Sequence, residues 1–203
     1  MNRPNELKRE LKRELKHETK HDTKRQLQIF KAADSGEVNE ERMATAEMSP
    51  ELGEGLQKIV EAGATEGFLL RCLFSDPVSG MSLVYVWLKS NYQLPIHTHN
   101  ADCAYYIMAG EAIMGNEVLK VGDCFFVPSG VRYSYSAGPE GAEVMEFRNA
   151  THFNIDYSGT GPKMMARIAE VSRANLDGWR KAPLPAAVRR FGIGNAVTSA
   201  VPG

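Results

Sequence analysis

Three features that define whole classes of protein are missing from this chain of 203 residues. It has no run of about 18 consecutive apolar residues, so no segment is expected to span a membrane. Residues 1–25 contain no apolar stretch of the kind that directs secretion. Cysteine is scarce: Cys72, Cys103 and Cys124 are odd in number and widely spaced, which indicates neither a disulfide framework nor a zinc-binding Cys-x-x-Cys pair. Together these absences predict a reduced, soluble, cytoplasmic protein.

An excess of charge of either sign is also missing. The formal net charge is -1 and 43% of the residues are hydrophobic, so the chain can form a sizeable core and is not expected to coat nucleic acid. The balance conceals a basic beginning, because residues 1–25 hold nine Lys/Arg and five Asp/Glu in a tandem repeat of four residues. This repeat is compatible with a coiled-coil arm, a basic tail or a metal site at His17 and His21, but a four-residue period drifts around a helix. The sequence therefore favours a solvated, partly helical extension, with neither nucleic acid nor membrane as a partner.

The composition divides the chain into three parts. Residues 1–48 are predicted to be a charged extension and polar linker, disordered or partly helical. Residues 49–160 are predicted to form a β-barrel preceded by a short helix, with Ser49 as its N-cap and Gly63 at its end. Residues 161–203 are predicted to form a C-terminal helix and a loose tail. The apolar stripe of that helix is expected to pack on the barrel or on a second subunit of a homodimer.

Short strands alternate with turns across the central part of the chain. Runs rich in β-branched and aromatic residues are separated by glycine- and proline-rich turns, and no helix lies between consecutive strands. This even spacing predicts an antiparallel sandwich or barrel and argues against a parallel sheet with crossover helices. The predicted strands cover residues 67–74, 81–88, 104–108, 111–114, 117–120, 123–127, 131–136 and 143–148, with turns at residues 109–110 and 138–141.

A pair of histidines is the first sign of chemistry. His97 and His99 are two residues apart, so on a strand both side chains project from the same face. Inside a small barrel this arrangement would put two imidazoles side by side. Neutral imidazoles are suitable ligands for Fe, Mn, Ni, Cu or Zn, so the pair is a candidate site for a divalent transition metal.

Two sequence blocks surround this pair. The first runs from His97-x-His99 through Cys103 to Gly110, and the second is Gly122, five residues, Pro128-x-Gly130, two residues, Tyr133. In these spacings residues 65–150 resemble the cupin superfamily, whose first motif is His-x-His followed by Glu and Gly, and whose second motif ends in His. The resemblance implies an all-β fold, the double-stranded β-helix or jelly-roll barrel, with N-terminal and C-terminal helical extensions and the site in the barrel mouth.

The two blocks depart from the cupin pattern at two metal-binding positions. Cys103 stands where the family has its Glu, and Tyr133 stands where it has its third His. A thiolate at Cys103 or a phenolate at Tyr133 could serve as a ligand, and Glu146 would complete a two-His-one-carboxylate triad if it faces inward. The predicted metal ligands are therefore His97, His99, Cys103 and Glu146.

Three classes of function remain open. The favoured one is a small-molecule metalloenzyme, an oxygen-dependent and dioxygenase-like oxidoreductase, in which Tyr133 or Tyr105 acts as acid or base or orients the substrate. The second is a metal-free isomerase, epimerase or lyase, in which a histidine and Tyr133 share proton transfer. The third is a non-catalytic barrel that binds a small ligand as a sensor or storage protein. One fold supports many functions, so the fold does not decide among them.

Deleting residues 1–25 should leave the melting temperature of the protein nearly unchanged. The repeat offers almost no apolar area that could be buried against the barrel. Thermal unfolding of the full and shortened chains, followed by circular dichroism, measures the difference. A drop of many degrees would show that the repeat packs on the core or on a partner subunit.

Overall fold

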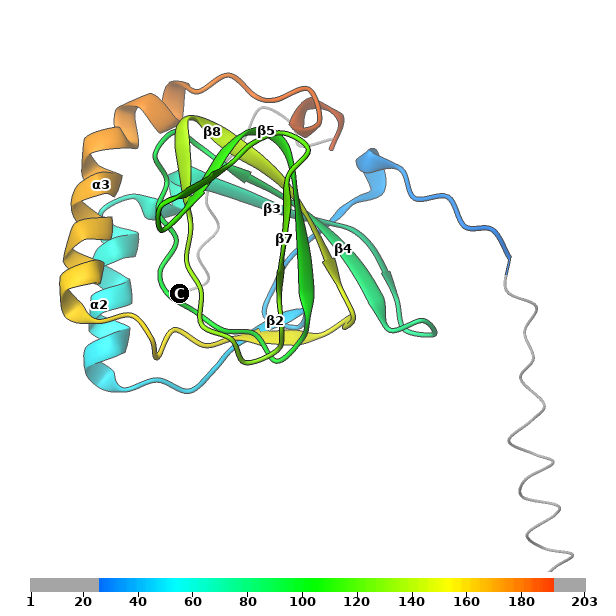
Figure 1. Cartoon of the computed structure of the whole chain (residues 1–203), viewed down its shortest axis with the longest axis horizontal. Helices are drawn as coiled ribbons and strands as arrows, with labels where there is room; N and C mark the ends of the chain where they lie inside the picture. The colour runs from blue at the N-terminus through cyan, green and yellow to red at the C-terminus, as the bar shows by residue number, and fades with distance from the viewer. Residues whose placement is uncertain (1–25, 192–203) are drawn as a thin grey trace, which may run out of the picture.

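The computed structural model describes residues 26–191, so the charged repeat and residues 192–203 lie outside the described part of the chain. Strands surround a central interior, and two helices run along one side of it (Figure 1). In chain order the elements are the 3-10 turn η1 (Ala32–Asp34), strands β1 (Gly36–Glu37) and β2 (Met43–Thr45), helix α2 (Pro50–Glu61), the 3-10 turn η2 (Ala64–Gly67), strands β3 (Phe68–Asp76), β4 (Met81–Leu88), β5 (Cys103–Met114), β6 (Glu117–Leu119), β7 (Cys124–Val127), β8 (Ser136–Arg148) and β9 (Phe153–Ile155), helix α3 (Pro162–Lys181) and the 3-10 turn η3 (Val188–Arg190).

One antiparallel sheet forms the body of the barrel. Its strands follow the order β1-β3-β4-β8-β5-β6, and β7 pairs with β5 outside this path. Strand β8 pairs with β4 on one edge and with β5 on the other. A backbone bridge between His97 and Tyr133 helps to join the two irregular segments that contain them. This architecture confirms the predicted all-β barrel with helical extensions.

Both predicted helices are present. The side chain of Ser49 accepts a hydrogen bond from the backbone N–H of Leu52 at 3.3 Å, and Gly63 ends α2 with a φ of 86°, a conformation that favours glycine. Helix α3 packs against α2. Met165, Ile168 and Trp179 of its apolar stripe are buried, and the indole N–H of Trp179 donates to the backbone carbonyl of Ser90 at 2.8 Å. The stripe therefore joins α3 to the barrel of its own chain.

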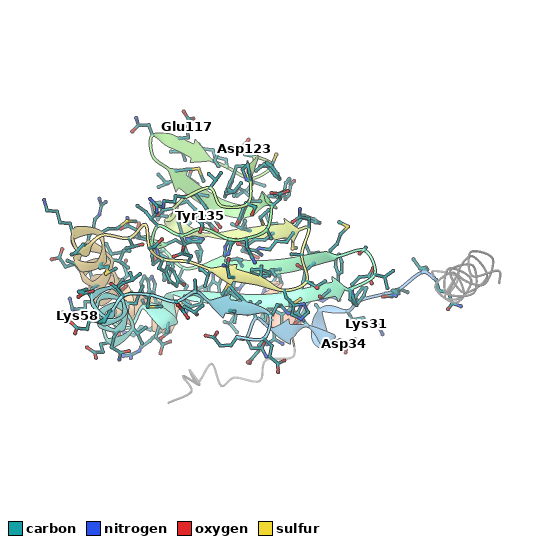
Figure 2. The ribbon with its side chains drawn as sticks, turned by 90° about the horizontal axis from the view of Figure 1, so that it is seen from below. Lys31, Asp34, Lys58, Glu117, Asp123 and Tyr135 are labelled. Atoms are coloured by element: carbon teal, nitrogen blue, oxygen red, sulfur yellow. The ribbon has the colours of Figure 1, made fainter. Side chains whose placement is uncertain are left out.

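Alternation along β5 and β8 determines which side chains reach the interior. On β5, Cys103, Tyr105 and Ile107 are buried, whereas the residues between them are exposed. On β8, every second residue is buried, from Ala142 through Val144, Glu146 and Arg148. Figure 2 shows Tyr135 among the strands, while Glu117, Asp123, Lys31 and Asp34 lie at the periphery. The strand period therefore brings both apolar and charged side chains of β8 into the barrel.

Two predicted turns are wrong, because the segments lie within long strands. Residues 109–110 belong to β5 and residues 138–141 belong to β8, and the register between these strands shifts near Gly110. Gly110 has a φ of 68°, and a Cβ added to it would lie 2.0 Å from the carbonyl oxygen of Gly141. The glycines therefore permit a bulge and a close approach of two strands where the sequence suggested a reversal of the chain.

Three other segments also differ from the prediction. Residues 131–135 form irregular backbone held by bridges, and β8 begins at Ser136. The expected linker contains β2, which pairs in parallel with β9. Within the expected tail, Val188 and Phe191 are buried, and the ring of Phe191 lies edge-on to that of Tyr85 at 4.9 Å. Tertiary partners distant in sequence create these elements, and local sequence patterns do not reveal them.

Neither helix of residues 26–191 combines the length and the apolar composition that crossing a membrane requires.

Replacing Gly110 with alanine should destabilise the protein markedly more than replacing Gly115. Both glycines have positive φ, which costs a non-glycine residue about 1–2 kcal/mol. Only Gly110 faces backbone atoms of another strand, whereas nothing lies within 4 Å of a Cβ at Gly115. Overpacking should therefore add about 1–3 kcal/mol to the cost of Gly110→Ala. Urea unfolding of Gly110→Ala and Gly115→Ala tests this; equal losses would contradict the bulge.

Candidate functional site

A cavity of about 350 Å³ occupies the barrel interior, at the lower end of the range of about 300–1,000 Å³ that is typical of small-molecule sites. One part of its wall is apolar and includes Leu56 and Ile59 of α2 and Phe68 of β3. The other part is polar. Its polar side chains include His97, His99, Tyr133, Tyr135, Glu146, Arg148 and Tyr157.

The two histidines lie in the irregular segment between β4 and β5. The backbone of His97 exchanges hydrogen bonds with that of Tyr133, at 3.0 and 3.1 Å, and the carbonyl of His99 accepts one from Gly130 at 2.8 Å. These bonds hold both residues against the second sequence block. The two imidazole ring centroids are 5.0 Å apart, which confirms that the pair faces the interior together.

Backbone carbonyls determine the tautomer of both imidazoles. Nδ1 of His97 lies 2.8 Å from the carbonyl oxygen of Pro95, and Nδ1 of His99 contacts the carbonyl oxygen of Asn154. A carbonyl oxygen only accepts hydrogen bonds, so each Nδ1 carries the proton and donates it. In the neutral ring, Nε2 then keeps a lone pair that can accept a proton or bind a metal.

Both imidazoles are neutral at neutral pH. Burial is the main cause, lowering the pKa of His97 to about 4 and that of His99 to about 3. The positive charge of Arg148 lowers both pKa values further. The cavity wall therefore presents two uncharged bases near a fixed cation.

Tyr133 lies directly beside the histidines. Its ring centroid is 4.3 Å from that of His97, and its hydroxyl shares a hydrogen bond with the hydroxyl of Tyr105. Burial raises the pKa of both phenols well above the ordinary value, and the charge of Glu146 raises them further. Both hydroxyls are therefore protonated at neutral pH and can donate hydrogen bonds. Tyr105 itself lies behind Tyr133, outside the set of residues that line the cavity.

Glu146 and Arg148 form a buried ion pair on the same face of β8. Nη1 of Arg148 lies 2.6 Å from Oε2 of Glu146, and the two side chains are 3% and 10% exposed. This contact lacks hydrogen-bond geometry: among the described residues, Nε and Nη1 of Arg148 have no hydrogen-bond partner. Burial acts to lower the pKa of Arg148, but Glu146 and, to a smaller extent, Tyr105, Cys103 and Tyr133 together raise it by more, so its guanidinium stays charged.

Sequence analysis missed Arg148 although the signal was present. The sequence left open whether Glu146 faces inward, and Arg148 follows it by two residues on the same strand. The same period therefore applies to both side chains. An arginine at the end of a strand resembles an ordinary surface residue, and only burial distinguishes it.

Cys103 is buried on β5, but it is absent from the residues that line the cavity. Its thiol lies 3.8 Å from the carbonyl oxygen of Ala104, and burial raises its pKa to about 12. A thiol with this pKa is protonated at neutral pH and is a weak ligand unless a metal displaces its proton. The surroundings of Cys103 are those of a small buried apolar side chain.

Whether these residues fit a transition metal depends on how many donor atoms converge. His97 and His99 fit as two imidazole ligands, because Nδ1 of each ring is already bonded. Across residues 26–191, however, no three His, Cys, Asp or Glu side chains lie close enough together to hold a metal ion. Glu146 lines the cavity but is paired with Arg148. The arrangement offers two donors and does not fit a metal held by three side chains of the predicted set.

A second hollow of about 720 Å³ lies between α2 and α3. It is lined by residues such as Glu51, Lys58 and Arg173, and it contains neither a histidine nor a tyrosine. Larger volume alone does not bring acid–base groups together, so the barrel cavity remains the candidate site.

No protein-family model and no curated protein sequence matches the chain. Solved structures do match. An RmlC-like cupin from Shewanella frigidimarina is 23% identical with a TM-score of 0.37, over 41% of this chain and 76% of that protein. KdgF from Halomonas sp. is 20% identical with a TM-score of 0.38, over 40% of this chain and 77% of that protein. A protein of unknown function with a cupin-like fold from Ralstonia eutropha is 15% identical with a TM-score of 0.37, over 55% of this chain and 75% of that protein.

With identities of 15–23% and TM-scores of 0.37–0.38, these matches decide neither the family nor the function of the chain. Substrate, reaction and cofactor therefore have to be argued from the chemistry of the cavity wall.

The two buried histidines should make the stability of the protein fall as the pH is lowered from about 6.5 towards 4. An unfolded histidine takes up a proton near pH 6.5, whereas folded His97 does so only near pH 4 and His99 near pH 3. Acid therefore favours the unfolded state, and the histidine contribution is fully present only above pH 6.5. Urea unfolding at stepped pH, with a chelator present, measures the slope.

Each histidine contributes at most about 1.4 kcal/mol per pH unit to that slope. The variant His97→Gln should lose up to one proton of pH dependence relative to the parent protein. A slope in His97→Gln that matches the parent protein would contradict the assignment.

Proposed function

We propose that the protein is a small-molecule enzyme that works by proton transfer inside the barrel, as an isomerase or a lyase. The observation that carries this proposal is the position of the Tyr133 phenol beside His97, with both groups on the wall of one cavity. A protonated hydroxyl and an uncharged Nε2 provide a hydrogen-bond donor and a base within one site.

The reaction that suits these groups removes a proton from carbon next to a carbonyl. Nε2 of His97 takes the proton, and the electron pair of the C–H bond moves towards the carbonyl oxygen. The Tyr133 hydroxyl donates a hydrogen bond to that oxygen and stabilises its developing charge. The proton then returns to another carbon in an isomerase, or an adjacent leaving group departs with its electron pair in a lyase.

Neighbouring residues position this pair. Tyr105 contacts the Tyr133 hydroxyl, and His99 lies beside His97 with its ring at 73° to it. Tyr133 and the two histidines are each more than nine-tenths buried. Exclusion of water strengthens the hydrogen bonds that such groups make to a reacting oxygen.

A metal-dependent oxidoreductase of the dioxygenase type is a second candidate. The observation in its favour is that both Nδ1 atoms donate to backbone carbonyls, which leaves two Nε2 lone pairs on one wall. Tyr133, water or substrate would have to provide the remaining donors. Metal analysis of protein purified without an affinity tag, together with His97→Ala and His99→Ala variants, tests this candidate.

That two copies of the chain form a homodimer also stays a prediction.

Exchange of substrate hydrogen for deuterium measures the proposed proton transfer before the natural substrate is known. The protein is incubated in D2O with a panel of small ketones and organic acids, and loss of C–H signals is followed by NMR. Tyr133→Phe should slow exchange by about 100- to 1,000-fold, because it removes one donor to the developing charge. Tyr106→Phe, on the exposed face of β5, is the matched control and should have no effect.

Three results would contradict the proposal. Exchange that is equally fast in Tyr133→Phe and in the parent protein would remove the phenol from the reaction. Absence of exchange across the panel, with stoichiometric iron, manganese, nickel, copper or zinc in the protein, would favour the metal-dependent candidate. Binding without exchange and without metal would favour a ligand-binding protein.

A further inference from the structure

Arg148 is the most unusual group of the cavity wall, because it is a permanently charged side chain that is only 4% exposed. A guanidinium carries five N–H donors and is expected to satisfy most of them when it is buried. Among the described residues the side-chain atoms Nε and Nη1 of Arg148 are buried without a hydrogen-bond partner. Its one polar contact is the ion pair with Glu146.

The surroundings of Arg148 explain how it is held in place. Its Cζ lies 4.2 Å from the centroid of the Phe153 ring, which stacks against the guanidinium. Strand pairing places Arg148 opposite Cys103 on β5 and Ser82 on β4. One aromatic face, two neighbouring strands and Glu146 therefore fix the side chain at the edge of the cavity, while its hydrogen-bonding capacity remains unused.

We infer that Arg148 is the anchor for a carboxylate group, and that the substrate class of the cavity is small organic acids with an apolar body. A carboxylate supplies two acceptor oxygens in the planar geometry that matches a guanidinium fork. The apolar wall, formed by residues such as Ile59, Phe68, Leu70 and Leu88, suits the hydrocarbon part of such a molecule. This inference rests on the proposed function, because it takes the barrel cavity to be the substrate site.

Glu146 competes with the ligand for the same guanidinium. Its Oε2 contacts Nη1 at 2.6 Å without hydrogen-bond geometry, so it compensates charge and leaves donors for a second carboxylate. Removing the charge of Glu146 while keeping its shape should therefore strengthen carboxylate binding. A purely structural ion pair predicts the opposite, because loss of one partner would weaken the wall that surrounds the ligand.

Matched pairs of acid and amide test this inference by calorimetry and thermal shift. Hexanoate is compared with hexanamide, and benzoate with benzamide, so that each pair differs only in charge and acceptor geometry. The parent protein should bind each acid about 10- to 100-fold more tightly than its amide. Arg148→Gln should abolish this preference, and Glu146→Gln should increase it. Arg173→Gln, which removes the same charge from the exposed surface of α3, should leave it unchanged.

Three results would overturn the inference: no preference for acids in the parent protein, a preference that persists in Arg148→Gln, or a preference that falls or stays the same in Glu146→Gln. If Arg148→Gln does not fold, the direction of the change in Glu146→Gln decides alone. Binding requires no turnover, so the two proposals fail separately. Arg148-dependent binding without deuterium exchange would contradict only the proposed function, and exchange on ketones without acid preference would contradict only this inference.

Discussion

The pairing of β8 with β4 on one edge and β5 on the other is the constraint on which the rest of the structure depends. Because β8 is paired along both edges, its alternate side chains have no freedom to choose a face. Ala142 and Val144 fill the core from this strand, and the same period then carries Glu146 and Arg148 inward. The buried ion pair is thus a consequence of strand register. The segment with the two histidines, between β4 and β5, lines the same cavity as this ion pair.

Burial of this polar cluster has one effect on each kind of group in it. It makes the imidazoles difficult to protonate and the phenols difficult to deprotonate, so His97 and Tyr133 are both uncharged. The one fixed cation and the nearby carboxylate are then the main electrostatic influence in the cavity. A base with a pKa of about 4 is weak, but that value includes the effect of Arg148. An anion bound at Arg148 would offset this effect and make His97 a stronger base.

Much of this site could be predicted from the sequence, and the reasons for the gaps are physical. The spacing of His97, His99 and Tyr133 predicted three residues that the structure brings to one wall, and the sequence left open whether Glu146 faces inward, which the structure shows that it does. Arg148 was overlooked because charged residues are rarely buried, although the same alternation applied to it. Gly110 was misjudged because turns and bulges use glycine for the same conformational reason. The pairing of β2 with β9 depends on residues more than a hundred positions apart, which no local pattern reveals.

The two departures from the cupin pattern, Cys103 and Tyr133, both place a protonated group where the pattern has a metal ligand. Cys103 replaces an anionic ligand with a thiol that is protonated in its buried position, and Tyr133 replaces an imidazole with a phenol that stays protonated. Both changes replace strong metal ligands with protonated groups that bind a divalent cation weakly, and Arg148 and Glu146 add opposite charges to the same cavity wall. The formal charges of this ion pair cancel, so they favour neither a cation nor an anion by themselves. An anion differs from a cation because it can accept hydrogen bonds from the donors of Arg148 and from the Tyr133 hydroxyl, and the proposal of an anionic ligand rests on these donors.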